Sequence, residues 1–296
     1  MIHLSGGWGM NLGATQTAVS ATEQLLNLWL HGKSPRTSEY YRLYAMRFIS
    51  FVGKPLHLVT LAEVQGFAAS LEEQGLAKST QRTIMAAVRS LISFGNKSEV
   101  LPRNVGALVE LPSSPDTLNE RLLTELEVQT MIALETNPRN RAILRLLYLG
   151  GLRASELCQL TWNNLQLRGN SGQVTVLGKG SKTRSILLPA SLWVELMQLR
   201  GDATPNEPVF RSRKGSHSGH LTRERVHQIV KAAAQRAGIK GNVSPHWLRH
   251  AHATHALERG AKIHLVAETL GHSSVAITSR YLHARPEDSS SLYLPG

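Results

Sequence analysis

The sequence predicts a mainly α-helical protein with one small β-sheet, built as an N-terminal four-helix domain followed by a mixed α/β domain. Helical periodicity runs from Ala18 to about Leu108, a proline-containing polar stretch follows at 112–120, and two strand-like runs interrupt the helices beyond it. The chain has 296 residues, of which 42% are hydrophobic, which is enough for two cores. We therefore expect two domains joined by a linker.

The N-terminal domain, 18–111, is expected to be a bundle of helices with short connections. Ser34-Pro35 supplies a cap and a first-turn proline for its second helix. The expected helices cover residues 22–30, 35–52, 61–73 and 81–95. Residues 1–17 are rich in glycine and small polar residues, so we expect a flexible tail, in which Met10 is an alternative start.

The second domain, 121–285, combines helices with a β-hairpin. Residues 173–177 and 184–188 are expected to be its strands, joined by the turn Gly178-Lys179-Gly180-Ser181. The expected helices begin at Thr124 and then cover residues 139–149, 154–160, 222–237 and 245–259. Residues 286–296 are expected to form a C-terminal tail, in which Leu292-Tyr293-Leu294 is a candidate apolar plug for a neighbouring protomer.

The charge of the chain favours a polyanionic partner. Lys and Arg number 33 and Asp and Glu 21, for a net charge of +12. Up to Pro115 there are 10 basic and 7 acidic residues, and after it 23 and 14, so the net charges are +3 and +9. Basic proteins are drawn to nucleic acid by counterion release. Ribosomal and membrane-surface proteins are also basic, so charge alone does not decide between these classes.

Other features exclude some function classes. No run of about 18 apolar residues occurs, so no membrane span is expected, and the first residues do not form a secretory signal. The single cysteine, Cys158, rules out an intrachain disulfide and fits a reducing cytoplasm. Its apolar helical context predicts a buried packing thiol.

Five short segments of the second domain carry residues suited to attack on a phosphodiester. They are Leu152-Arg153-Ala154-Ser155-Glu156-Leu157, Gly178-Lys179-Gly180, Ser244-Pro245-His246-Trp247-Leu248-Arg249-His250, Leu270-Gly271-His272-Ser273 and Ser279-Arg280-Tyr281-Leu282-His283. The pentacoordinate transition state gains negative charge, so cationic donors are the main need. A tyrosine nucleophile must lose a proton, and the leaving sugar oxygen must gain one from Lys or His. Two Arg, one Lys, two His and one Tyr meet these needs without metal.

The local spacing supports this chemistry. His246 and Arg249 are three residues apart on a helix that Pro245 opens, so they share a face close to a helix N-terminus, where an anion is favoured. Arg153 follows Gly150-Gly151, which allows a tight turn.

These segments, in this order and at these separations, resemble the tyrosine recombinases of the phage integrase family, nearest to the Xer type. The resemblance covers about residues 18–285 and implies a SAM-like, core-binding first domain and a recombinase catalytic domain that close on DNA as a C-shaped clamp. It implies that Arg153 and Arg249 bind the phosphate, with Glu156 orienting Arg153. It further implies that Lys179 protonates the leaving oxygen, that His246 handles the tyrosine proton, that His272 bonds a non-bridging oxygen and that Tyr281 is the nucleophile.

The resemblance also implies the reaction and its partners. Cleavage leaves a 3′-phosphotyrosine, and strands are exchanged through a Holliday junction with no metal, ATP or other cofactor. The expected partner is double-stranded DNA with inverted repeats, bound by one dimer per site and by a homotetramer on two sites. Base readout is expected from 222–237 or 78–89, where a solvated helical face is the alternative.

Alternatives stay open at several residues. Lys182 and Arg184 share the hairpin and are rivals for the role of Lys179, and Tyr293 is a rival nucleophile. His246 and His250 have the spacing of a zinc pair but lack further ligands in sequence. We expect the other histidines of this helix to pack or to cap, namely His250, His252 and His255. A DNA-binding architectural protein and a type IB topoisomerase are the alternative functions.

Overall fold

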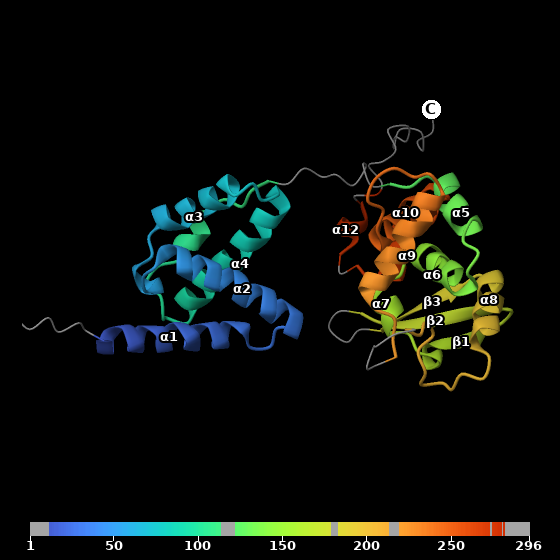
Figure 1. Ribbon diagram of the computed structural model, residues 1–296, viewed down its shortest axis with the longest axis horizontal. Helices are drawn as coiled ribbons and strands as arrows, with labels where there is room; N and C mark the ends of the chain where they lie inside the picture. Colours follow the sequence, from blue (N-terminus) through green and yellow to red (C-terminus); the bar gives the residue numbers. More distant parts are fainter. Residues whose placement is uncertain are drawn as a thin grey trace, which may run out of the picture. The chain divides into compact units, whose positions relative to one another are not determined.

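The computed structural model describes residues 12–113, 122–178, 183–212, 219–272, 274–279 and 281, with side chains described from residue 21 onward. The chain divides into two compact units, Met1–Asp116 and Thr117–Gly296. Figure 1 shows helices throughout and a small sheet in the second unit. The expected class, mainly α with a small β-sheet, is confirmed. No helix of the described part has the length and apolar character needed to cross a membrane.

The first unit is a helical bundle. Its α-helices are α1 (Leu12–Leu30), α2 (Pro35–Val52), α3 (Leu61–Glu73) and α4 (Lys78–Lys97), with short 3-10 helices η1 (Leu56–Leu58) and η2 (Val105–Leu108). Ser34 caps α2 and accepts a hydrogen bond from the Thr37 N–H, and Pro35 opens the helix. The bundle closes because apolar faces of all four helices meet around Phe48, Phe67 and Leu91, which are fully buried.

The second unit packs helices against one face of a three-stranded antiparallel sheet. Its helices are α5 (Glu125–Ala133), α6 (Pro138–Leu149), α7 (Ala154–Gln159), η4 (Trp162–Asn164), α8 (Ala190–Arg200), α9 (Arg223–Arg236), α10 (Pro245–Glu258), α11 (Ile263–Leu270) and α12 (Val275–Ser279). Its strands are β1 (Leu165–Arg168), β2 (Ser171–Leu177) and β3 (Thr183–Leu188), in the order β1-β2-β3.

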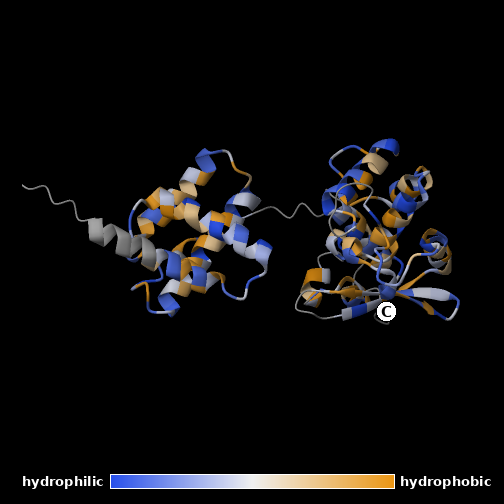
Figure 2. Ribbon diagram, turned by 60° about the horizontal axis from the view of Figure 1, so that its bottom comes forward, coloured by the Kyte–Doolittle hydropathy of each residue, from blue (hydrophilic) through white to orange (hydrophobic). Residues whose placement is uncertain are grey.

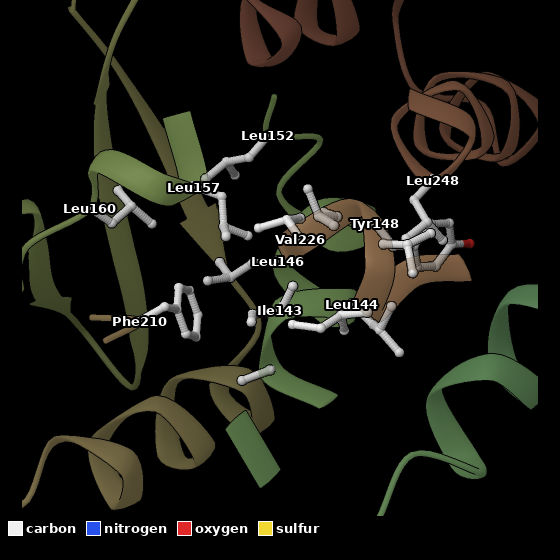
Figure 3. Packing of buried hydrophobic residues seen from close by; sticks show 14 of the residues in the cluster. Ile143, Leu144, Leu146, Tyr148, Leu152, Leu157, Leu160, Phe210, Val226 and Leu248 are labelled. Atoms are coloured by element: carbon white, nitrogen blue, oxygen red, sulfur yellow. The ribbon is translucent and has the colours of Figure 1, made fainter. Parts of the chain in front are cut away.

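Strand alternation decides which side chains enter the core of this unit. Val174 on β2 pairs with Ile186 on β3, and both are buried, whereas Ser185 and Leu187, the neighbours of Ile186 along β3, are exposed. The buried residues join a large cluster that includes Leu146, Leu157 and Leu248 from three helices (Figure 3). Figure 2 shows apolar residues gathered where the elements of each unit meet, with hydrophilic residues outside. Cys158 is buried, and burial raises the pKa of its thiol to about 11, as a packing cysteine requires.

Two elements differ from the prediction. Helix α1 begins at Leu12 rather than near residue 22, so residues 12–17 are helical and the predicted tail was too long. A helix that has nucleated extends by one hydrogen bond per residue and needs no apolar pattern to do so. Strand β1 was missed because only Leu165 of its four residues is buried. The predicted linker, 112–120, lies mostly outside the described residues.

Candidate active site

Arg153 stands at the N-terminal end of α7, where Glu156 holds it. The Arg153 N–H donates to Glu156 Oε2 at 2.7 Å, and Nη1 donates to Oε1 at 2.8 Å. One carboxylate thus caps the helix and holds the guanidinium, the contact with Arg153 that the resemblance to the family implies. The preceding turn requires Gly151, with φ of 57°, because an added Cβ would lie 2.7 Å from Leu270 Cδ2.

A second guanidinium reaches the same carboxylate from the sheet. Arg184 on β3 donates from Nη1 and Nη2 to Oε1 and Oε2 of Glu156, at 2.8 and 2.9 Å. Burial raises the pKa of Glu156, but the hydrogen bonds from Arg184 and from the Arg153 backbone outweigh it, so the pKa is lowered overall. Glu156 is therefore ionised at neutral pH.

Arg249 is the most deeply buried arginine of the site, at 2% exposure. It lies on α10, where Pro245 opens the helix, and donates from Nη1 to Gly151 O and from Nη2 to Leu270 O, each at 2.5 Å. Burial, and next the charge of Arg153, lower the pKa of Arg249 to about 9. The guanidinium remains charged at neutral pH and is held by two backbone carbonyls.

The C-terminal end of α11 gathers these three arginines. Gly271, with φ of 63°, ends the helix in the left-handed conformation. The three consecutive carbonyls there each accept from a different arginine: Thr269 O from Arg184 Nε at 2.7 Å, Leu270 O from Arg249 Nη2 at 2.5 Å, and Gly271 O from Arg153 Nη2 at 3.3 Å. A helix C-terminus carries unpaired carbonyls and partial negative charge, so it can serve as a template for cations.

Tyr281 lies beside this cluster and is 7% exposed. It packs against Ala253, Val266 and Leu270, and its N–H donates to Thr278 O at 3.0 Å. Its hydroxyl lies 2.6 Å from His250 Nδ1. The resemblance to the family implies that His246 handles the tyrosine proton, and the sequence predicts that His250 packs or caps, so neither indicates the contact of His250 with Tyr281. The available signal was helical spacing, because His250 is one turn beyond His246 on the same face.

His246 itself is exposed near the start of α10, and its ring centroid lies 4.6 Å from that of His250. His272 follows Gly271, and its Nδ1 lies 2.7 Å from Thr278 Oγ1. Burial, and next the charges of Arg249 and Arg153, lower the pKa of His272 to about 4. The structure thus brings Arg153, Arg249 and His272 together next to Tyr281.

Lys179 and its rival Lys182, the rival nucleophile Tyr293 and the apolar segment 292–294 all lie outside the described residues. Within the described part of the chain, no group of three or more His, Cys, Asp or Glu side chains is arranged to hold a metal ion. The zinc alternative for His246 and His250 therefore finds no third ligand there.

The electrostatics of the site favour an anion. Arg153 and Arg184 both form ion pairs with the carboxylate of Glu156. Arg249 bonds backbone carbonyls instead and is affected by Glu156 through its charge, so three guanidiniums lie near this one carboxylate. Burial is the largest cause of the lowered pKa values of Arg249 and His272, and the positive charges of the neighbouring arginines lower both pKa values further. Fixed cations next to a phenol can bind an anionic group and stabilise the charge that develops when the phenol attacks it.

Comparisons with known families agree with this chemistry. Residues 121–288 match the model of the phage integrase family, and residues 23–99 match that of the phage integrase N-terminal SAM-like domain. The chain is 32% identical to tyrosine recombinase XerD of Oceanobacillus iheyensis over 80% of its length and 83% of that protein. It is 36% identical to tyrosine recombinase XerC of Xanthomonas axonopodis pv. citri over 75% of its length and 73% of that protein.

Solved structures share the fold. The XerH recombinase bound to difH substrate in a pre-cleavage complex matches with a TM-score of 0.69 and 21% identity, over 99% of this chain and 92% of that one. A lambda integrase dimer bound to a COC′ core site matches with a TM-score of 0.69 and 18% identity, over 93% of this chain and 97% of that one.

Proposed function

The chain belongs to the phage integrase family and is a tyrosine recombinase of the Xer type, an enzyme of site-specific DNA recombination, and we propose that it cleaves double-stranded DNA by transferring a backbone phosphate to Tyr281. One observation carries the proposal: the buried phenol of Tyr281, which is hydrogen-bonded to His250, lies beside a group of arginines. Two of these arginines share the single negative charge of Glu156, so the group carries a net positive charge. Arginine forks are suited to the non-bridging oxygens of a phosphodiester.

The proposed step conserves atoms and charge. The Tyr281 oxygen forms a bond to phosphorus, the bond from phosphorus to the 5′-oxygen breaks, the phenol gives up its proton, and the 5′-oxygen takes one up. The product is a 3′-phosphotyrosine and a free 5′-hydroxyl. Because the ester retains the bond energy, a 5′-hydroxyl from another strand can reverse the step and rejoin the DNA without ATP.

The proposed roles are those that the resemblance to the family implies, and the contacts in the site support several of them. We assign Arg153 and Arg249 to the non-bridging oxygens, with His272 as a further donor to them. Lys179 stays the proposed acid for the 5′-oxygen and His246 the proposed acceptor of the tyrosine proton. His250, at 2.6 Å from the phenol, is a candidate to pass that proton on, since its ring lies next to that of His246.

The proposed assembly is one dimer on each inverted-repeat site and a homotetramer on two sites, exchanging strands through a Holliday junction. The lambda integrase dimer bound to its core site supports the dimeric step. The proposed roles of the two units are core-site binding for the first and catalysis for the second. A DNA substrate and a single unpaired cysteine support the cytoplasmic location that the sequence predicts.

Trapping of the covalent intermediate tests the proposal. The probe is a duplex recovered by repeated binding selection from a randomised library and nicked next to the cleaved phosphate, so that the released fragment diffuses away and religation stops. We expect wild-type protein to form an adduct that resists denaturation, and Tyr281→Phe to bind the probe without forming one.

Tyr148→Phe is the matched control, because Tyr148 is equally buried and also hydrogen-bonded to a histidine. Adduct formation by Tyr281→Phe, or its absence with wild-type protein on a tightly bound probe, would overturn the proposal.

A further inference from the structure

Arg184 connects three elements of the catalytic unit through one side chain. Its Nη1 and Nη2 donate to Glu156 at the start of α7, and its Nε donates to Thr269 O at the end of α11. Its side chain is 9% exposed, and it lies on β3 on the same face as the buried Ile186. A guanidinium bound through three nitrogens to fixed partners has little rotational freedom, so α7, β3 and α11 are held in register.

The effect of Arg184 reaches the phosphate-binding residues through Glu156. Glu156 Oε1 accepts from both Arg184 and Arg153 at 2.8 Å, and Gly271 O accepts from Arg153 on the other side. The orientation of Arg153 therefore depends on where Arg184 holds the carboxylate. The neighbouring carbonyl of Leu270 accepts a hydrogen bond from Arg249, so the same end of α11 also positions the second arginine proposed to bind the phosphate.

We propose that Arg184 is a positioning residue for the recombinase reaction, which sets the geometry of Arg153 and Arg249 without itself contacting the phosphate. The proposal rests on the proposed function. It replaces the earlier alternative that Arg184 is a rival for the role of Lys179, because all three of its bonding nitrogens face protein groups inside the unit.

Gly271 provides independent support. A Cβ at this position would lie 3.0 Å from Arg184 Nη1 and 3.2 Å from its Cδ and Cζ. The positive φ of 63° would also strain any residue with a side chain. The glycine therefore leaves the space that Arg184 occupies, and Gly271→Ala is expected to displace Arg184 without removing it.

The chain contains a matched control for this arrangement. Glu195 on α8 is buried and accepts from Arg141 Nε at 2.8 Å and from Arg145 Nη1 at 2.5 Å. This second group, again one carboxylate between two guanidiniums, joins α6 to α8, and Arg145 also donates to Ser191 Oγ. Substitution of Arg145 removes the same kind of ion pair from a place to which no role in cleavage is assigned.

The first experiment measures the rate of adduct formation in a single turnover on the selected, nicked duplex. We expect Arg184→Ala and Arg184→Lys to slow it about 100-fold, as a small misplacement of catalytic groups does. Lysine keeps the charge but not the fork, so it should not restore the rate. Arg145→Ala should leave the rate within about threefold of wild type, because its ion pair shares no partner with the site and distant, independent sites do not couple. Thermal unfolding shows whether each variant is folded. If Arg184→Ala does not fold, the comparison is made with Arg184→Lys alone.

Two further readouts separate positioning from a general structural effect. If Arg184 acts partly through Arg153, the Arg184→Ala substitution should slow the reaction less in an Arg153→Ala background than in the wild-type protein, because only its effect on Arg249 is left. On a probe whose cleaved linkage is a methylphosphonate, one non-bridging oxygen is replaced by a neutral methyl group. Less charge then needs stabilising, so the penalty of Arg184→Lys should shrink to less than about tenfold.

The outcomes distinguish the two proposals. An absence of adduct with wild-type protein would overturn the proposed function and this inference with it. A wild-type adduct together with Arg184 variants that cleave within about threefold of wild type, or with a fully additive double variant, would overturn the positioning role alone.

Discussion

Two tyrosines of the catalytic unit are each hydrogen-bonded to a histidine of α10, yet only one of the two lies in a site suited to nucleophilic attack. The Tyr281 hydroxyl lies 2.6 Å from His250 Nδ1, and the Tyr148 hydroxyl lies 3.0 Å from His255 Nδ1. Both tyrosines are 7% exposed. Burial and a histidine partner are therefore common to the two pairs and do not by themselves make a nucleophile.

The difference lies in the surrounding charges. Beside Tyr148, Glu125 and Arg259 are paired with each other, and the pKa of Tyr148 is raised by burial and next by the charge of Glu125. Beside Tyr281, the charge of a phenolate would raise the pKa of Arg249, which means that each charge stabilises the other. Positive charge in excess thus favours an incoming phosphate beside Tyr281 and not beside Tyr148.

The largest expected effect is a difference in cleavage rate between loss of Arg249, beside Tyr281, and loss of Arg259, beside Tyr148. Arg249→Ala should slow adduct formation by about 100- to 1,000-fold, because it removes a donor aimed at developing charge. Arg259→Ala, next to Tyr148, should leave the rate nearly unchanged, since its pair with Glu125 is exposed. Single-turnover rates on the selected duplex measure both. Equal losses in the two variants would break the comparison.

A smaller effect is expected from the two histidines. His250→Ala should slow adduct formation by about tenfold through loss of the phenol contact, which is a modest effect for a group that moves or holds a proton. His255→Ala should instead lower the free energy of unfolding, because His255 is buried and bonded to Tyr148. Rates and urea unfolding curves are compared for both variants, and an unchanged rate in His250→Ala would remove His250 from the account.

The two phenol hydroxyls should contribute similarly to stability. Tyr281→Phe and Tyr148→Phe should each lower the free energy of unfolding by about 1 kcal/mol, the usual value of one buried hydrogen bond. Urea denaturation measures this value. A loss several times larger in Tyr281→Phe alone would mean that its defect in cleavage is structural.

The smallest expected effect is a dependence of DNA affinity on pH. The pKa of His272 is lowered to about 4, so the free protein carries it neutral at pH 7. A phosphate bound between the arginines raises that pKa, so the complex holds more protons than the free protein below about pH 6.5. Affinity of the selected duplex should therefore increase as the pH falls from about 6.5 toward 4. His272→Gln should flatten this slope relative to wild type, and an identical slope would contradict the assignment.

Much of the fold was predictable because its signals are local. Pro35 and Pro245 open α2 and α10 where a first-turn proline predicts them, and Thr124, where the sequence predicts a helix start, forms a capping box with Glu127 of α5. These signals depend only on residues that are neighbours in sequence, so they can be recognised without knowing how the helices pack.

The site was less predictable because its contacts are long-range. Arg184 and Glu156 are 28 residues apart, and His250 and Tyr281 are 31 apart. Strand alternation with Ile186 and Leu188 indicates that Arg184 faces inward. No local feature of the sequence indicates that its ion-pair partner inside the unit is Glu156. The end of α11 gathers the arginines only once helices distant in sequence have packed.

The most direct test of the account is to identify the residue that carries the DNA. After wild-type protein has reacted with the nicked duplex, the adduct is digested and the attached peptide is sequenced by mass spectrometry. The account predicts nucleotide attached through phosphate to Tyr281. Attachment to Tyr148, Tyr293 or any other residue would contradict it.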